Sequence, residues 1–130
     1  MAVKRAVIRR DGGFCLLALP GCLGEAGTTD HRANRGSGGS RVLNDPVNLI
    51  AACAVCNGLK ADATGVLKLD LLERGLLIKP AATHESTLQL AIITPVMGLD
   101  GEWWMLLSAK DRRPATRQEI DFHLEAMVPF

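Results

Sequence analysis

The chain has 130 residues, 48% of them hydrophobic and 22% charged, with a net charge of +1 at neutral pH. This length suits one compact domain, and the apolar content excludes a disordered chain. No apolar run approaches the roughly 18 residues of a membrane-spanning helix, and MAVKRAVIRRDGG at the start lacks the apolar core of a secretory signal. We therefore expect a cytoplasmic protein with no membrane partner.

Short elements alternate with turns in the first half of the chain. Residues 3–10 can form a helix, and GTTDHR (27–32) supplies the β-branched residues of a strand. The segment RGSGGS (35–40) is typical of a flexible loop, and SRVL (40–43) can be the returning strand. The alanine-rich stretch 51–61 then predicts a helix.

The second half predicts a hairpin between helices. Residues 67–74 have a leucine face and end at Gly75, as expected for a helix. The apolar run LQLAIITPV, the turn GLDG and the stretch EWWMLL indicate a β-hairpin. TRQE (116–119) fits a capping box at the start of a terminal helix. We expect an α+β chain with one unit at 1–64 and a C-terminal extension of unknown function at 65–130, packed on it.

The four cysteines fall in two pairs, Cys15-x6-Cys22 and Cys53-x2-Cys56. In a reducing cytoplasm, four thiolates match one tetrahedral Zn²⁺ better than two disulfides, although the disulfide alternative stays open. The second pair has the tight spacing of a zinc knuckle, and the turn expected at Pro20 would shorten the reach of the first. The sequence thus predicts one structural zinc per chain, contributing about 10 kcal/mol or more of apparent binding energy.

Between and just beyond the cysteine pairs lie Asp30, His31, Asn48 and Asn57. The order "DHR…GGS…NLIAACAVCN" resembles the HNH endonuclease family, whose motif has a histidine on a first strand, a glycine-rich loop, Asn-Leu, and Cys-x2-Cys followed by His. Asn57 replaces the last histidine, so the chain looks like the HNN variant. The resemblance covers about residues 13–63. It implies a zinc-stapled ββα-metal, treble-clef-like unit, with the C-terminal β-hairpin and helix appended.

Phosphodiester hydrolysis gives each of these residues a role. His31 can act as the general base toward water, because a free imidazole accepts a proton near neutral pH. Asp30 and Asn57 would offer oxygen ligands to a catalytic Mg²⁺ or Mn²⁺, and Asn48 would organise the loop that orients His31. Because neighbouring strand residues point to opposite faces, these roles need a bend between Asp30 and His31.

Four basic residues surround this constellation in the sequence and are candidates to bind DNA phosphates: Arg32, Arg35, Arg41 and Lys60. The expected function is metal-dependent cleavage or nicking of DNA, with 5′-phosphate and 3′-hydroxyl ends as the resemblance implies. Small stand-alone members of the family occur in bacteriophages and bacteria, in packaging, homing or restriction, so the setting would be the cytoplasm of a bacterial host.

Two other functions stay open. A non-catalytic zinc module could bind nucleic acid or protein, with Asn57 marking decay of the motif. A nuclease active only with a partner protein, such as a phage packaging protein, suits the weak net charge, because the partner would supply DNA affinity. The stretch GSGGS lacks the Lys-Ser/Thr ending of a phosphate-binding loop, so we expect no nucleotide cofactor.

Overall fold

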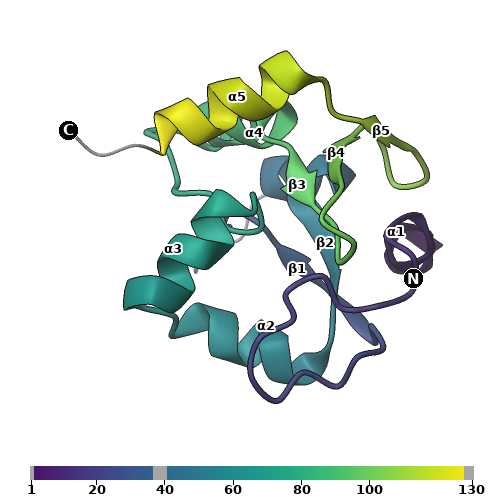
Figure 1. Cartoon of the computed structure of the whole chain (residues 1–130). Helices are drawn as coiled ribbons and strands as arrows, with labels where there is room; N and C mark the ends of the chain where they lie inside the picture. Colours follow the sequence, from purple (N-terminus) through teal and green to yellow (C-terminus); the bar gives the residue numbers. More distant parts are fainter. Residues whose placement is uncertain (1, 37–40, 128–130) are drawn as a thin grey trace.

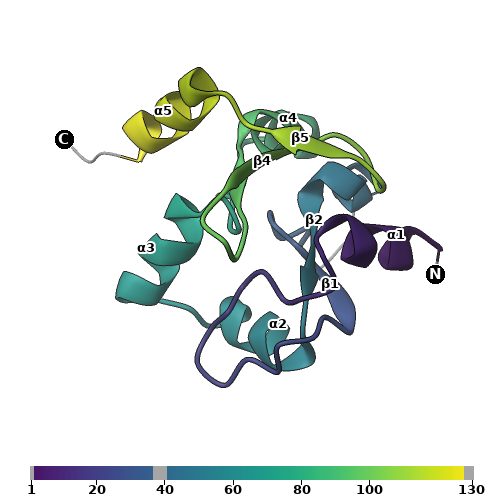
Figure 2. The same ribbon diagram turned by 45° about the vertical axis from the view of Figure 1, so that its right-hand side comes forward.

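The computed structural model describes residues 2–36 and 41–127, which fold as a mixed α+β protein with two small sheets. The elements in chain order are α1 (Ala2–Arg10), β1 (Thr28–His31), η1 (Val42–Asn44), η2 (Pro46–Asn48), β2 (Leu49–Ala52), α2 (Ala54–Ala61), α3 (Gly65–Glu73), α4 (His84–Ile93), β3 (Val96–Met97), β4 (Trp103–Leu106), β5 (Arg112–Pro114) and α5 (Arg117–Ala126). In both views, α4, α5 and the sheet β3–β4–β5 lie at one end, and α2 lies at the other (Figure 1 and Figure 2). The strands β1 and β2 run between these ends, with α1 at their side.

The first sheet is the antiparallel pair β1–β2, in a register that runs from Thr28 opposite Ala52 to His31 opposite Leu49. The buried ion pair of Arg10 and Asp11, at the end of α1, covers the edge of β2 that does not pair with β1. Arg10 donates to the carbonyl of Leu49 at 2.6 Å, and Asp11 accepts from the amide of Ala51 at 2.9 Å. These bonds satisfy edge groups that would otherwise need another strand or water.

The second sheet and the last helix agree with the sequence in most respects. β3 and β4 form the predicted hairpin, and β5 adds a third strand that we did not predict. The capping box is confirmed, because Thr116 accepts from the amide of Glu119 at 3.1 Å and Glu119 accepts from the amide of Thr116 at 2.8 Å. None of the helices in the described ranges is long and apolar enough to cross a membrane.

Two expected strands are helical. Val42 and Leu43 of the predicted strand SRVL belong to the 3-10 helix η1, and Ser40 lies outside the described residues together with 37–39 of the glycine-rich loop. The run LQLAIITPV is mostly α4, because Thr83 and Ser86 cap a helix there, and its only strand residue is Val96.

The returning strand is instead β2, and it takes up the first residues of the helix predicted at 51–61. Ala51 and Ala52 pair with β1, so α2 begins only at Ala54, after Cys53. The helix propensity of alanine is a weak preference, and here the backbone hydrogen bonds to a neighbouring strand override it. Asp45 caps η2, the 3-10 helix that leads into β2, by accepting from the amide of Val47 at 3.0 Å.

One hydrophobic core joins the two halves of the chain. It contains Leu17, Ile50 and Cys53 from the first half and Leu71, Leu76, Ala91, Val96 and Leu106 from the second. The described parts of the two halves, 2–36 with 41–64 and 65–127, therefore share one core. Within the second half, Gly75 permits a close approach to the segment before β3, because a Cβ there would lie 1.9 Å from the carbonyl oxygen of Pro95, at a positive φ of 72°.

Candidate functional site

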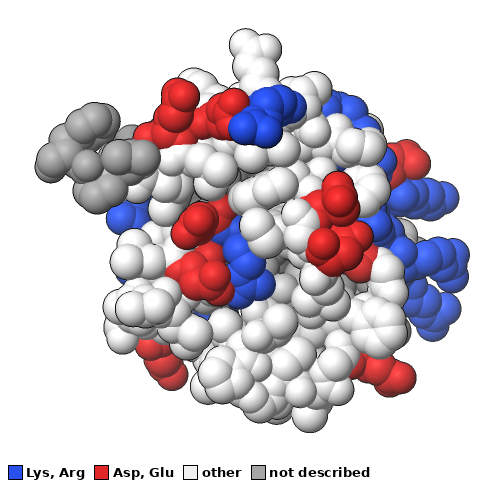
Figure 3. Space-filling view, viewed as in Figure 1, with Lys and Arg blue, Asp and Glu red and all other residues white. Residues whose placement is uncertain are grey.

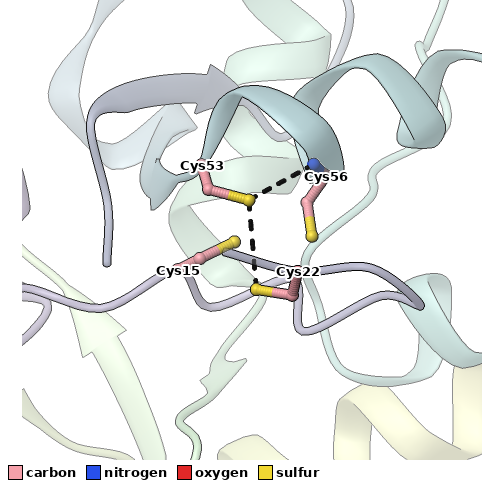
Figure 4. A group of neighbouring side chains, drawn as sticks. All are labelled: Cys15, Cys22, Cys53 and Cys56. Atoms are coloured by element: carbon pink, nitrogen blue, oxygen red, sulfur yellow. Dashed lines mark hydrogen bonds between the residues drawn. The ribbon is translucent and has the colours of Figure 1, made fainter. Parts of the chain in front are cut away.

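The four cysteine sulfurs lie within 4.8 Å of one another, close enough to hold one metal ion (Figure 4). Three of the cysteines are buried, and Cys22 is partly exposed. Four thiolate donors around one point are the set that a structural zinc prefers, so the predicted zinc site is compatible with this geometry. Within the described ranges, no other group of three or more His, Cys, Asp or Glu side chains gathers in this way.

Two local features bring the cysteines together. The amide of Cys22 donates to the carbonyl of Leu19 at 2.9 Å across Pro20 and Gly21, and Gly21 has a φ of 85°, as a type II turn requires. Cys53 follows the last residue of β2 and caps α2, where its sulfur accepts from the amide of Cys56 at 3.4 Å. The turn expected at Pro20 is therefore present, and it reduces the distance between Cys15 and Cys22, the more widely spaced pair.

The ionisation of these thiols is unequal without a cation. Burial raises the pKa of Cys15 and of Cys56. Burial also opposes ionisation of Cys53, but hydrogen bonds from the amides of Leu23 and Cys56 and from neighbouring thiols lower its pKa to about 6. The protein alone thus favours the thiolate at Cys53, and a bound divalent ion would supply the charge that favours thiolates at Cys15 and Cys56.

His31, the last residue of β1, has a ring orientation that the structure defines. Its Nε2 lies 2.8 Å from Oδ1 of Asn44, and Arg35 lies 3.3 Å from the same oxygen. Because a guanidinium can only donate, the Asn44 atom between them is an acceptor, so Nε2 of His31 carries the proton. The free lone pair of neutral His31 is therefore on Nδ1. Sequence reasoning missed Asn44, since nothing in its spacing distinguishes it.

Asn48 is fully buried behind this histidine. Its side chain donates to the carbonyls of Ala33 and Leu43 at 3.0 and 2.9 Å and accepts from the amide of Ala33 at 2.9 Å. These hydrogen bonds link Ala33, two residues after His31, to Leu43 in the segment that leads to β2. This position fits the organising role expected for Asn48.

Asp30 forms an ion pair with Lys60 of α2. Lys60 is 8% exposed, contacts the carbonyl of His31 and reaches the carbonyl of Arg32 at 3.4 Å. Burial raises the pKa of Asp30 and lowers the pKa of Lys60, and their mutual attraction opposes both shifts. Lys60 is thus committed to Asp30, which corrects its assignment as a phosphate ligand. Asn57 precedes Lys60 by three residues, so both lie on one face of α2.

The bend that we expected between Asp30 and His31 is absent. The strand register is unbroken through Asp30 opposite Ile50 and His31 opposite Leu49, so the two side chains leave opposite faces of the hairpin. The chain bends only after the strand, at residues 32–33.

Arg32 is not a phosphate-binding group, which corrects a second prediction. It is fully buried and donates to four carbonyls, those of Val47, Gly75, Ala91 and Thr94, at 2.6 to 3.0 Å. Burial lowers its pKa to about 9, with a further contribution from the charge of Arg10, and the guanidinium stays protonated at neutral pH. Its function is to join β1 to the second half of the chain. Arg35 and Arg41 are exposed and remain candidates for phosphate binding, and Arg35 contacts the Asn44 oxygen that also contacts His31.

Comparison of the chain with models of known protein families, with curated proteins and with solved structures gave no match.

Proposed function

We propose that the chain is a metal-dependent DNA endonuclease of the HNH type, in its HNN variant. In this proposal β1, β2 and α2 are the ββα-metal unit, and the four cysteines hold a structural zinc. The observation that carries it is the joint placement of the motif residues: Asp30 and His31 end the first strand, and Asn57 lies on the helix that the cysteines anchor, one turn before the lysine that contacts Asp30.

His31 would act through Nδ1. Hydrolysis requires a base that removes a proton from the attacking water, and the Nε2 proton is held by Asn44, so Nδ1 is the atom available to accept it. The hydrogen bonds of Asn48 limit the motion of the chain next to this base. The entropy cost of ordering this part of the chain is therefore met when the protein folds, before the substrate binds.

Asp30 and Asn57 are the residues that would hold a catalytic Mg²⁺ or Mn²⁺, through carboxylate and amide oxygens of the kind these ions prefer. Such an ion would stabilise the negative charge that develops on the phosphate oxygens. Lys60 contacts Oδ2 of Asp30, so Oδ1 is the oxygen left for the ion.

Two observations favour a second candidate, the non-catalytic zinc module: Asp30 is paired with Lys60, and Asp30 and His31 leave opposite faces of β1 without the bend that their joint catalytic roles need. If the ammonium of Lys60 permanently satisfies Asp30, the chain has a structural zinc and no catalytic metal. This candidate predicts zinc and nucleic-acid or protein binding without cleavage.

The deciding experiment is conversion of supercoiled plasmid to nicked or linear DNA by zinc-loaded protein, with added Mg²⁺ or Mn²⁺. His31→Ala should abolish conversion while the zinc content stays at one per chain. His84→Ala is the matched control, because His84 is exposed at the start of α4. An inert wild type would favour the non-catalytic module, and equal cutting by wild type and His31→Ala would refute the base assignment.

A further inference from the structure

The exposed face of α1 is a strongly basic surface that the site described above does not use. The helix, Ala2–Arg10, contains four basic residues and no acidic one. Arg10 is buried against Asp11, which leaves Lys4, Arg5 and Arg9 exposed. Across residues 2–36 and 41–127, the ion pairs include none of these three.

The three cations share one side of the helix. At about 100° per residue, Lys4, Arg5 and Arg9 fall within about 140° of one another, and the buried Val7 and Arg10 lie on the opposite side. In Figure 3, basic side chains gather over α1 at the right of the view, whereas acidic and basic side chains are mixed over the centre of this face. We name the set of Lys4, Arg5 and Arg9 the α1 basic face.

This face is joined to the candidate site through the β1–β2 hairpin. α1 packs against both strands, and Arg10 at its end donates to the carbonyl of Leu49. Leu49 is the strand partner of His31. The helix that bears the α1 basic face therefore packs on the same pair of strands that bears His31.

We propose that the α1 basic face binds the phosphate backbone of duplex DNA beside the segment that is cut. The choice of duplex DNA rests on the proposed function. Duplex DNA carries one negative charge per about 1.7 Å of axis, and a nine-residue helix is about 13 Å long, so α1 can follow the backbone over about four base pairs. Such contacts add affinity and fix the register of the duplex, and they do not select sequence.

Salt dependence of duplex binding tests this surface directly. The triple variant Lys4→Gln, Arg5→Gln, Arg9→Gln keeps good helix formers in α1 and removes three charges. The control triple variant Lys68→Gln, Lys79→Gln, Arg117→Gln removes the same charge from exposed positions in the second half. The full-length zinc-loaded proteins are compared by anisotropy of a fluorescein-labelled duplex without added Mg²⁺ or Mn²⁺, after circular dichroism shows equal helix content and thermal midpoint.

Each lost phosphate contact should reduce the steepness of the plot of log affinity against log salt concentration by about 0.9, so the slope of the α1 variant should be shallower by up to about 2.7. At 50 mM salt, the α1 variant should bind the duplex at least about tenfold more weakly than the wild type. The control should lose much less. Equal losses in both variants, or an unchanged α1 variant, would overturn the proposal. Weaker binding to an RNA duplex alone would show that DNA is the wrong partner.

Plasmid cleavage separates this proposal from the proposed function. In a cutting enzyme, the α1 variant should raise KM and leave kcat at saturating DNA near the wild-type value. If the wild type cuts and the α1 variant binds like the wild type, the α1 surface is wrong and the nuclease stands. If binding depends on α1 but no preparation cuts with Mg²⁺ or Mn²⁺, the surface stands and the nuclease is wrong.

Discussion

Replacing Lys60 with methionine tests the ion pair at the centre of the candidate site. Methionine keeps most of the apolar stem and removes the ammonium, so the Asp30 carboxylate stays in place with its side chain only 12% exposed. Removing one partner of a buried pair typically costs about 3–5 kcal/mol. Because Asp30 retains some contact with water, we expect the lower end, a loss of about 3 kcal/mol in the free energy of unfolding at pH 7.

The pH dependence follows from the direction of the pKa shift. Burial already raises the pKa of Asp30, and loss of the Lys60 charge, which opposes that shift, should raise it further. A carboxyl whose pKa is higher in the folded state than in the unfolded state destabilises the protein above the folded pKa. This penalty disappears as the pH falls through the folded pKa toward 3.8, so the deficit of Lys60→Met should shrink on acidification.

Urea unfolding of zinc-loaded protein at pH 7 and at pH 5 measures both effects. Lys68→Met on α3 is the control for an exposed lysine and should change stability by less than about 0.5 kcal/mol. Adding Asp30→Asn to Lys60→Met should recover most of the loss. A loss below about 1 kcal/mol, or an equal loss in the Asp30→Asn background, would refute the reasoning. Added Mg²⁺ should stabilise Lys60→Met more than the wild type if Asp30 is a metal ligand.

Three further substitutions test other contacts. Cys56→Ser should reduce zinc below one per chain, measured by mass spectrometry, and should lower the thermal midpoint because a zinc ion on the four cysteines would hold α2 to the segment that bears Cys15 and Cys22. Asn48→Ala removes three buried hydrogen bonds and should cost about 3 kcal/mol in urea unfolding, and in an active enzyme it should lower kcat more than metal affinity. Gly75→Ala places a Cβ against the carbonyl of Pro95 and should cost more than about 2 kcal/mol by the same unfolding assay; an unchanged midpoint would show that the backbone at Gly75 and at Pro95 can move apart without loss of stability.

The features that can be predicted from this sequence are those whose partners lie within a few residues. The Pro20–Gly21 turn, the knuckle at Cys53 and Cys56, and the capping box at Thr116 each need only a short stretch of chain to form. The strand that bears Asp30 and His31 is also found from its β-branched residues. These local patterns determined the α+β class and the cysteine cluster.

The tertiary structure decided which basic side chains are free to meet a ligand. Arg32 and Lys60 look like surface cations in the sequence, but the acceptors that bury them come from Val47 to Thr94 and from β1, respectively. A charged side chain is buried only where distant segments together supply its hydrogen bonds, and no local pattern encodes that arrangement. For the same reason, the contact of Asn44 with His31 and the pairing of Ala51 and Ala52 as a strand appear only in the folded chain.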